Sequence, residues 1–170
     1  MKFKKGQDRV VVVVVSLGIA IKFPIIHVWN VVRLLYRYMG MGSKQKYHWE
    51  LFDEIVGVLF RGLTANWGEF LFYWQTGNAF LQPTYLSLFG LMNIQRAGEP
   101  CLLKCEDLWF QFDELTEGKV GDLHHFTNIE NFCVYKGGLR MLDYGSPASR
   151  RVVAQYGTKI AKDFKMGKKR

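Results

Sequence analysis

The stretch that decides the fold is "GDLHHFTNIENFCVYKGGLRMLDYG", residues 121–145. Two apolar arms, residues 131–135 and 139–143, flank the turn residues Lys136–Gly137–Gly138, a pattern that predicts a β-hairpin. An aspartate stands near each end, at Asp122 and Asp143. Because a hairpin brings the chain before its first arm beside the chain after its second, we expect both carboxylates at one edge.

Amide side chains between the two aspartates extend this set of oxygen ligands. Asn128 and Asn131 both precede the first arm of the predicted hairpin. Two carboxylates and an amide suit Mg²⁺, which keeps several waters and binds substrate phosphates. The alternative is an ordinary hairpin, because aspartates are also common at the ends of strands and turns.

Composition predicts a folded globular protein, and the order of the expected strands and helices predicts the α+β class. The chain has 170 residues, of which 49% are apolar and 22% charged, and its net charge is +8. That charge lies at the ends: residues 1–9 carry +3, residues 149–170 carry +7, and the remainder carries −2. The basic ends are interpreted either as solvated arms or as a nucleic-acid contact made mainly by the C-terminal tail.

Three cysteines, Cys101, Cys105 and Cys133, form an odd set that does not predict a disulfide framework. The spacing of the first two is poor for zinc, so free thiols are expected. The apolar run of 12 residues at 10–21 is too short to cross a bilayer. With no targeting segment visible, we expect a cytoplasmic protein without a membrane partner, in the host cytoplasm if it is encoded by a bacteriophage.

Hydrophobic periodicity divides the chain into two unequal parts, residues 1–98 and 99–170, separated at a hinge in "GEP". Expected strands are residues 9–15, 19–24, 83–90, 91–98 and the two hairpin arms. Expected helices are residues 25–40, 47–62, 64–77, 102–115 and 150–164, with Thr64 as an N-cap and Gly77 as a stop.

Lys22 and Glu69 are charged residues in apolar surroundings. Lys22 is the single charge of the strand "IAIKF", and Glu69 lies in the aromatic helix "WGEFLFYW". Burying either side chain is costly unless it is paired or faces a cleft. A strand lysine paired with a helix glutamate, followed by a carboxylate–amide–carboxylate hairpin, is the order of groups used for phosphoryl transfer.

At these residues the chain resembles the protein kinase family. "IAIKF" is similar to the family's "VAIK" strand, "GDLHHFTN" to its catalytic loop, and "LRMLDYG" to the strand that ends in "DFG". The "GD-L-H" form is closer to the aminoglycoside- and lipopolysaccharide-kinase branch than to "HRD". The whole set, over residues 10–147, resembles very short kinase-like proteins of bacteriophages and bacteria. The resemblance implies a minimal bilobal fold: a β-rich N-lobe with a helical insertion, and a truncated C-lobe.

The resemblance also implies roles for individual residues. Lys22 would contact the ATP phosphates and pair with Glu69, and Asp122 would orient the attacking hydroxyl. Asp143 would bind Mg²⁺. The metal's amide ligand would be Asn128 or Asn131, and the hinge residues Gly98 and Glu99 would meet the adenine.

The chain departs from the family's pattern in three places. The step from Asp122 to Asn128 is six residues instead of five, so the choice between Asn128 and Asn131 stays open. No glycine-rich phosphate loop is present in the first residues, where Gly6 is alone. Only 27 residues follow Asp143, in the region that seats the substrate in the family.

Three functions remain open from the sequence. The first is an ATP- and Mg²⁺-dependent kinase that phosphorylates a protein or a small hydroxyl compound, with a host protein as one target. The second is a catalytically inactive kinase-like module that docks on a partner protein. The third is a nucleic-acid-binding accessory protein that uses its basic ends.

Overall fold

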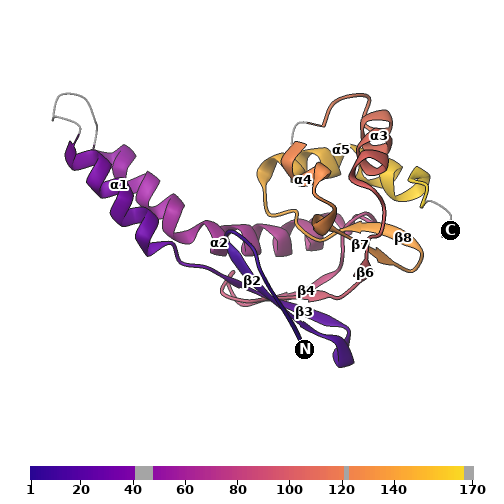
Figure 1. The fold of residues 1–170 in the computed structure, drawn as a ribbon, viewed down its shortest axis with the longest axis horizontal. Helices are drawn as coiled ribbons and strands as arrows, with labels where there is room; N and C mark the ends of the chain where they lie inside the picture. Colours follow the sequence, from indigo (N-terminus) through magenta and orange to yellow (C-terminus); the bar gives the residue numbers. More distant parts are fainter. Residues whose placement is uncertain (41–47, 121–122, 167–170) are drawn as a thin grey trace.

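The computed structural model describes residues 1–40, 48–120 and 123–166 of the chain. Its strands form two antiparallel sheets, helices interrupt each sheet along the chain, and one helix follows the last strand (Figure 1). The predicted α+β class is therefore confirmed. The division predicted after residue 98 falls between the last strand of the first sheet and the first strand of the second.

The first sheet has five strands. In spatial order they are β1 (Lys2–Lys5), β2 (Arg9–Val14), β3 (Ile19–Pro24), β5 (Asn93–Arg96) and β4 (Thr84–Ser87). The predicted pair around residues 16–18 is confirmed as β2 and β3. The short 3-10 turn η1 (Val15–Leu17) joins them and ends at Gly18, whose φ of 60° favours glycine. Successive valines suit β2 because β-branched side chains pack well on a pleated surface.

Strand β1 corrects the interpretation of the N-terminal residues as a solvated arm. Its four residues are exposed, yet they pair in register with β2, from Lys2 opposite Val13 to Lys5 opposite Val10. The amide of Gly6 donates to the carbonyl of Arg9 at 2.8 Å, which leaves Gln7 and Asp8 as the turn between the strands. The strand forms because the backbone of β2 offers a free edge, whatever the charge of the side chains.

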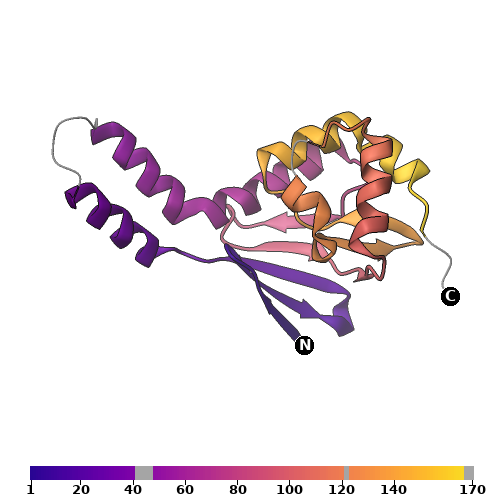
Figure 2. The ribbon, with the colours of Figure 1, turned by 45° about the horizontal axis from the view of Figure 1, so that its top comes forward.

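Helix α1 (Val28–Gly40) and the first half of α2 (His48–Thr76) run side by side and project from the rest of the molecule (Figures 1 and 2). The second half of α2 packs against the first sheet. The two helices predicted over residues 47–62 and 64–77 are in fact the single helix α2. Thr64 is not an N-cap: its hydroxyl donates to the carbonyls of Phe60 at 3.2 Å and Arg61 at 3.0 Å, within the preceding turn. The stop at Gly77, with a φ of 54°, is confirmed.

The second sheet contains the predicted hairpin. Its strands are β6 (Glu99–Pro100), β7 (Phe132–Tyr135) and β8 (Gly138–Met141), in that order. The turn residues Lys136 and Gly137 have φ values of 51° and 76°, as a tight hairpin turn requires. The segment predicted as a hinge also forms β6, which pairs with β7.

Four further helical segments belong to the C-terminal half. They are α3 (Cys105–Leu115), α4 (Leu123–Thr127), the 3-10 turn η2 (Ile129–Asn131) and α5 (Pro147–Asp163). The apolar core lies here, and Phe80, Phe112 and Phe132 pack together inside it. Helix α5 buries Val153 and Ile160 in this core, so most of the basic C-terminal region is a docked helix and not a solvated arm.

No helix in the described ranges is long and apolar enough to cross a membrane.

Candidate functional site

A buried polar layer lies between the first sheet and α2, in contrast to the apolar core of the C-terminal half. Lys22 on β3 and Glu69 on α2 are both buried, and Lys22 Nζ lies 2.8 Å from Glu69 Oε2. Lys22 Nζ also donates to the carbonyl of Leu142 at 2.6 Å. The sequence predicted the pairing of these two residues, and the geometry confirms it.

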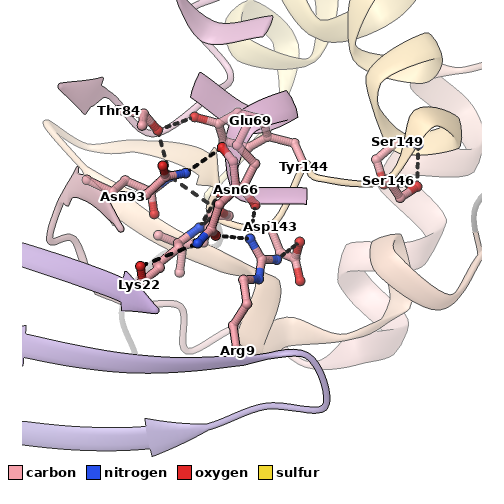
Figure 3. Close-up of polar contacts among 12 residues, drawn as sticks. Arg9, Lys22, Asn66, Glu69, Thr84, Asn93, Asp143, Tyr144, Ser146 and Ser149 are labelled. Atoms are coloured by element: carbon pink, nitrogen blue, oxygen red, sulfur yellow. Dashed lines mark hydrogen bonds and ion pairs between the residues drawn. The ribbon is translucent and has the colours of Figure 1, made fainter. Parts of the chain in front are cut away.

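Arg9 completes this cluster and was missed in the sequence. Its Nη1 donates to Glu69 Oε1 at 2.5 Å, and its Nη2 forms an ion pair with Asp143 Oδ1 (Figure 3). Glu69 is thereby shared by two cations, and Arg9 is shared by two carboxylates. We use "charge cluster" below for Arg9, Lys22, Glu69 and Asp143.

The pairing register of β2 and β3 is the signal that places Arg9 beside Lys22. Val11 pairs with Lys22 across β2 and β3, so the two side chains lie on the same face. Side chains alternate along a strand, so Arg9, two residues before Val11, lies on that face as well. The turn at residues 16–18 fixes this register, and Arg9 could have been placed beside Lys22 from the sequence.

Amide side chains fasten α2 to the sheet at the depth of the charge cluster. Asn66 Nδ2 donates to the carbonyl of Gly90 at 3.0 Å, and Asn93 Nδ2 donates to the carbonyl of Asn66 at 2.6 Å. Both side chains are fully buried. A buried amide must find partners because an unmade hydrogen bond is expensive in a low-dielectric interior. These bonds therefore fix the helix position that carries Glu69, three residues after Asn66.

Asp143 reaches the cluster from the end of β8. The amide of Leu142 donates to the carbonyl of Asn131 at 2.7 Å, which holds the preceding residue against the start of the hairpin. The side chain of Asp143 is 31% exposed, so it is the member of the cluster that solvent reaches most readily. Burial by itself would raise the pKa of Asp143, but the charges of Arg9 and Lys22 lower the pKa to about 2.

The two cations respond to burial in opposite directions. Burial lowers the pKa of Lys22, against the attraction of Glu69. Burial also opposes the charge on Arg9, but the carboxylates of Glu69 and Asp143 outweigh it and raise the pKa of the guanidinium. Lysine titrates far more readily than arginine when buried, so Arg9 is the permanent charge of the pair.

Tyr144 ties the segment after β8 to the first sheet. Its hydroxyl lies 2.7 Å from Thr84 Oγ1 and donates to the carbonyl of Gln82 at 2.9 Å. Burial raises the pKa of this phenol, which stays neutral. Because Tyr144 directly follows Asp143, these bonds position the carboxylate relative to β4.

The two candidate asparagines lie in different surroundings. The side chain of Asn128 accepts from the amide of Glu130 at 3.1 Å and so caps η2. Asn131 donates from Nδ2 to the carbonyl of His125 at 3.0 Å, while its own carbonyl accepts from Leu142. The structure therefore joins the backbone of Asn131 to the residue before Asp143, whereas the side chain of Asn128 caps η2.

Two other predicted site residues, Gly98 and Glu99, are not brought to the cluster. Asp122 lies outside the described residues. Gly98 packs so closely on Cys133 that a side chain would not fit, and Glu99 is exposed in β6. Within the described residues, Glu99 forms no hydrogen bond or ion pair with the charge cluster.

Metal binding at the cluster would depend on Asp143 and Asn131. The described part of the chain contains no group of three or more His, Cys, Asp or Glu side chains able to hold a metal. A site for Mg²⁺ with few protein ligands is still chemically consistent with Asp143 and Asn131, because this ion keeps waters and binds phosphates. One carboxylate oxygen of Asp143 is engaged by Arg9, so a metal would compete with that guanidinium.

A cavity of about 300 Å³ opens beside Asp143. Arg9, Arg61, His125, Asp143 and Arg150 are among its lining residues, and Lys22 is not. Asp143 therefore reaches this cavity, whereas the ammonium group of Lys22 is engaged by Glu69 and by the carbonyl of Leu142.

No protein-family model, curated protein or solved structure matches the chain. The functional argument therefore depends on the residues of the site.

Proposed function

We propose that the protein is a minimal ATP- and Mg²⁺-dependent phosphotransferase with a protein-kinase-like bilobal fold. Its acceptor would be a protein or a small hydroxyl compound. The observation that carries the proposal is the buried ion pair of Lys22 and Glu69, 2.8 Å apart, within one charge cluster with Asp143. These residues come from β3, α2 and the end of a β-hairpin, which is the order of groups that phosphoryl transfer uses.

The arrangement of the two sheets supports the bilobal interpretation. The first sheet and α2 supply Lys22 and Glu69, whereas the second sheet supplies Asp143. A short connection between β5 and β6 joins the two parts. Phosphates that lie where the parts meet would be in reach of groups from both, which is the usual location of ligand sites.

Each residue of the cluster has a definite task in this proposal. Lys22, held by Glu69 and by the carbonyl of Leu142, would direct its remaining hydrogen to phosphate oxygens. Asp143 is ionised at neutral pH because its pKa is about 2, so it would be a ready ligand for a cation together with Asn131. A bound Mg²⁺ would neutralise part of the negative charge of the phosphates. Asp122 would orient the acceptor hydroxyl.

Magnesium-dependent formation of ADP tests the proposal. Lys22→Met and Asp143→Ala should each reduce the rate by at least about a hundredfold, the effect of losing one or two strong transition-state contacts. Lys119→Met is the matched control, because Lys119 is an exposed lysine whose ion pair with Glu117, at 3.4 Å, lies on the surface. Turnover that both cluster variants retain, in folded protein, would exclude the proposal.

A second candidate function is an inactive kinase-like module that binds a partner protein. Arg9 favours it, because its guanidinium already neutralises Asp143 where a metal would bind. The turn before β2 favours it too, since only Gln7 and Asp8 replace a glycine-rich phosphate loop. Asp8 is fixed there by Arg61, whose Nε lies 3.3 Å from its Oδ2.

Arg9→Gln distinguishes the two functions. An active enzyme should still turn over ATP in this variant, with tighter Mg²⁺ binding, because Asp143 loses its competing cation. An inactive module should show a nucleotide-dependent thermal shift at most, and no ADP formation in either form. Autophosphorylation of the wild-type protein would rule out the inactive module.

A further inference from the structure

The cavity beside Asp143 has one cation more than the carboxylates around it can neutralise. Asp8 is paired with Arg61 and also lies 3.0 Å from His27 Nε2, and Asp143 is paired with Arg9. Arg150, on α5, also lines the cavity, and its side chain has no ion pair or hydrogen bond with any described residue. An unpaired guanidinium in a partly enclosed site is a strong attractor for an anion.

The side chain of Arg150 contacts α2. Its guanidinium lies against Gly68 of α2, so closely that a side chain at position 68 would clash with it. The positive end of α5 faces the same cavity through Ser146 and Pro147, the cap and first residue of this 17-residue helix. The dipole of the helix therefore adds to the charge of Arg150.

We propose that this cavity binds a phosphate group, with Arg150 as the principal ligand and Arg61 at its rim. A planar guanidinium matches two phosphate oxygens at once, which makes arginine the preferred partner of this group. The cavity of about 300 Å³ admits a phosphate carried on another molecule as well as the free ion. Lys22 does not line the cavity, whereas Asp143 does. The inference does not depend on phosphoryl transfer.

Calorimetric titration with inorganic phosphate, without nucleotide or metal, tests the site. Binding should be saturable in the full chain, and Arg150→Gln should weaken it by at least about tenfold, or roughly 1.4 kcal/mol. Arg151→Gln is the matched control, because the neighbouring Arg151 is exposed and does not line this cavity. Arg150→Lys, which keeps the charge but loses the planar fork, should bind with intermediate affinity.

Further titrations identify the source of the phosphate and define the results that would contradict the proposal. Tighter binding of phosphoserine than of inorganic phosphate would indicate a phosphorylated side chain, and the reverse would indicate the free ion. Heat that does not saturate, or that sodium chloride of equal ionic strength reproduces, would overturn the proposal. An equal loss in the Arg150 and Arg151 variants would overturn it as well.

Discussion

Arg9 and Asp143 stand 134 positions apart in the sequence and form an ion pair in the structure. Through Glu69, which accepts from both Arg9 and Lys22, this pair joins the first sheet, α2 and the end of the hairpin. The charge cluster is therefore a structural connection as well as a candidate site. Its strength can be measured without knowing the substrate.

Glu69→Gln should destabilise the fold strongly. The substitution leaves the buried cations Arg9 and Lys22 without the carboxylate that they share, and loss of one partner of a buried ion pair costs about 3–5 kcal/mol. Urea unfolding measures the change in free energy. Glu117→Gln is the control: its partners Lys119 and Lys159 are exposed, so it should change stability by less than about 1 kcal/mol. Equal losses in the two variants would contradict the buried cluster.

The pair of Arg9 and Asp143 should contribute stability that acid removes. The pKa of Asp143 is about 2 in the folded chain and about 3.9 in an unfolded one, so the folded state holds fewer protons on this group. The contribution is complete above about pH 5 and is lost as the pH falls toward 2. Allowing for partial exposure, we expect about 1–2 kcal/mol.

Asp143→Asn isolates that contribution. The variant should be less stable than the wild type at pH 6, and the difference should shrink steadily between pH 4 and about pH 2, as judged by urea unfolding at each pH. A difference that stays constant over this range would show that Asp143 does not carry the effect.

Tyr144→Phe should cost about 1–2 kcal/mol, since it removes the shorter hydrogen bonds of the buried Thr84 hydroxyl and Gln82 carbonyl. Both groups would keep only a 3.4 Å bond from Gln95 Nε2. Thermal unfolding compares it with Tyr36→Phe, which alters an exposed tyrosine on α1 and should change little. In an active enzyme, Tyr144→Phe should also lower turnover because it loosens the residue next to Asp143. Unchanged stability would show that the hydroxyl is dispensable.

Two glycine substitutions should have opposite signs. A Cβ at Gly145 would lie 2.8 Å from the Cβ of Ala65 on α2, so Gly145→Ala should push the chain after Asp143 away and destabilise it. Gly57 lies within α2 with nothing near its missing side chain, so Gly57→Ala should stabilise the helix by about 0.5–1 kcal/mol. Chemical denaturation measures both changes, and a shared sign would contradict the close approach at Gly145.

The hairpin and the strand pair were predictable because their signals are local. The turn at Lys136 and Gly137, and the turn before Ile19, are short and lie between β-forming arms. The pairing of Lys22 with Glu69 was predictable for another reason: a charge inside an apolar segment demands a partner.

The continuity of α2 was not predictable from local residues. Gly62 and Thr64 resemble a break, yet Gly62 is required where the backbone of Asp8 and Pro24 presses against the helix. Tertiary contact thus explains the glycine that local reasoning interpreted as a helix end. The place of Arg9 in the charge cluster was not predicted, because a basic residue in a basic terminal segment is usually solvated.

The ion pair between Arg9 and Asp143 can form only after the intervening chain has been synthesised. Arg9 leaves the ribosome before Asp143, which follows it 134 positions later. Until then two buried cations, Arg9 and Lys22, have only Glu69 between them. Without Asp143, the two cations exceed the single carboxylate that they share. We therefore expect the first sheet to complete its packing only when the hairpin forms, as is usual for contacts of long sequence separation. A nascent chain stalled before the hairpin should therefore be the form that proteases and chaperones recognise.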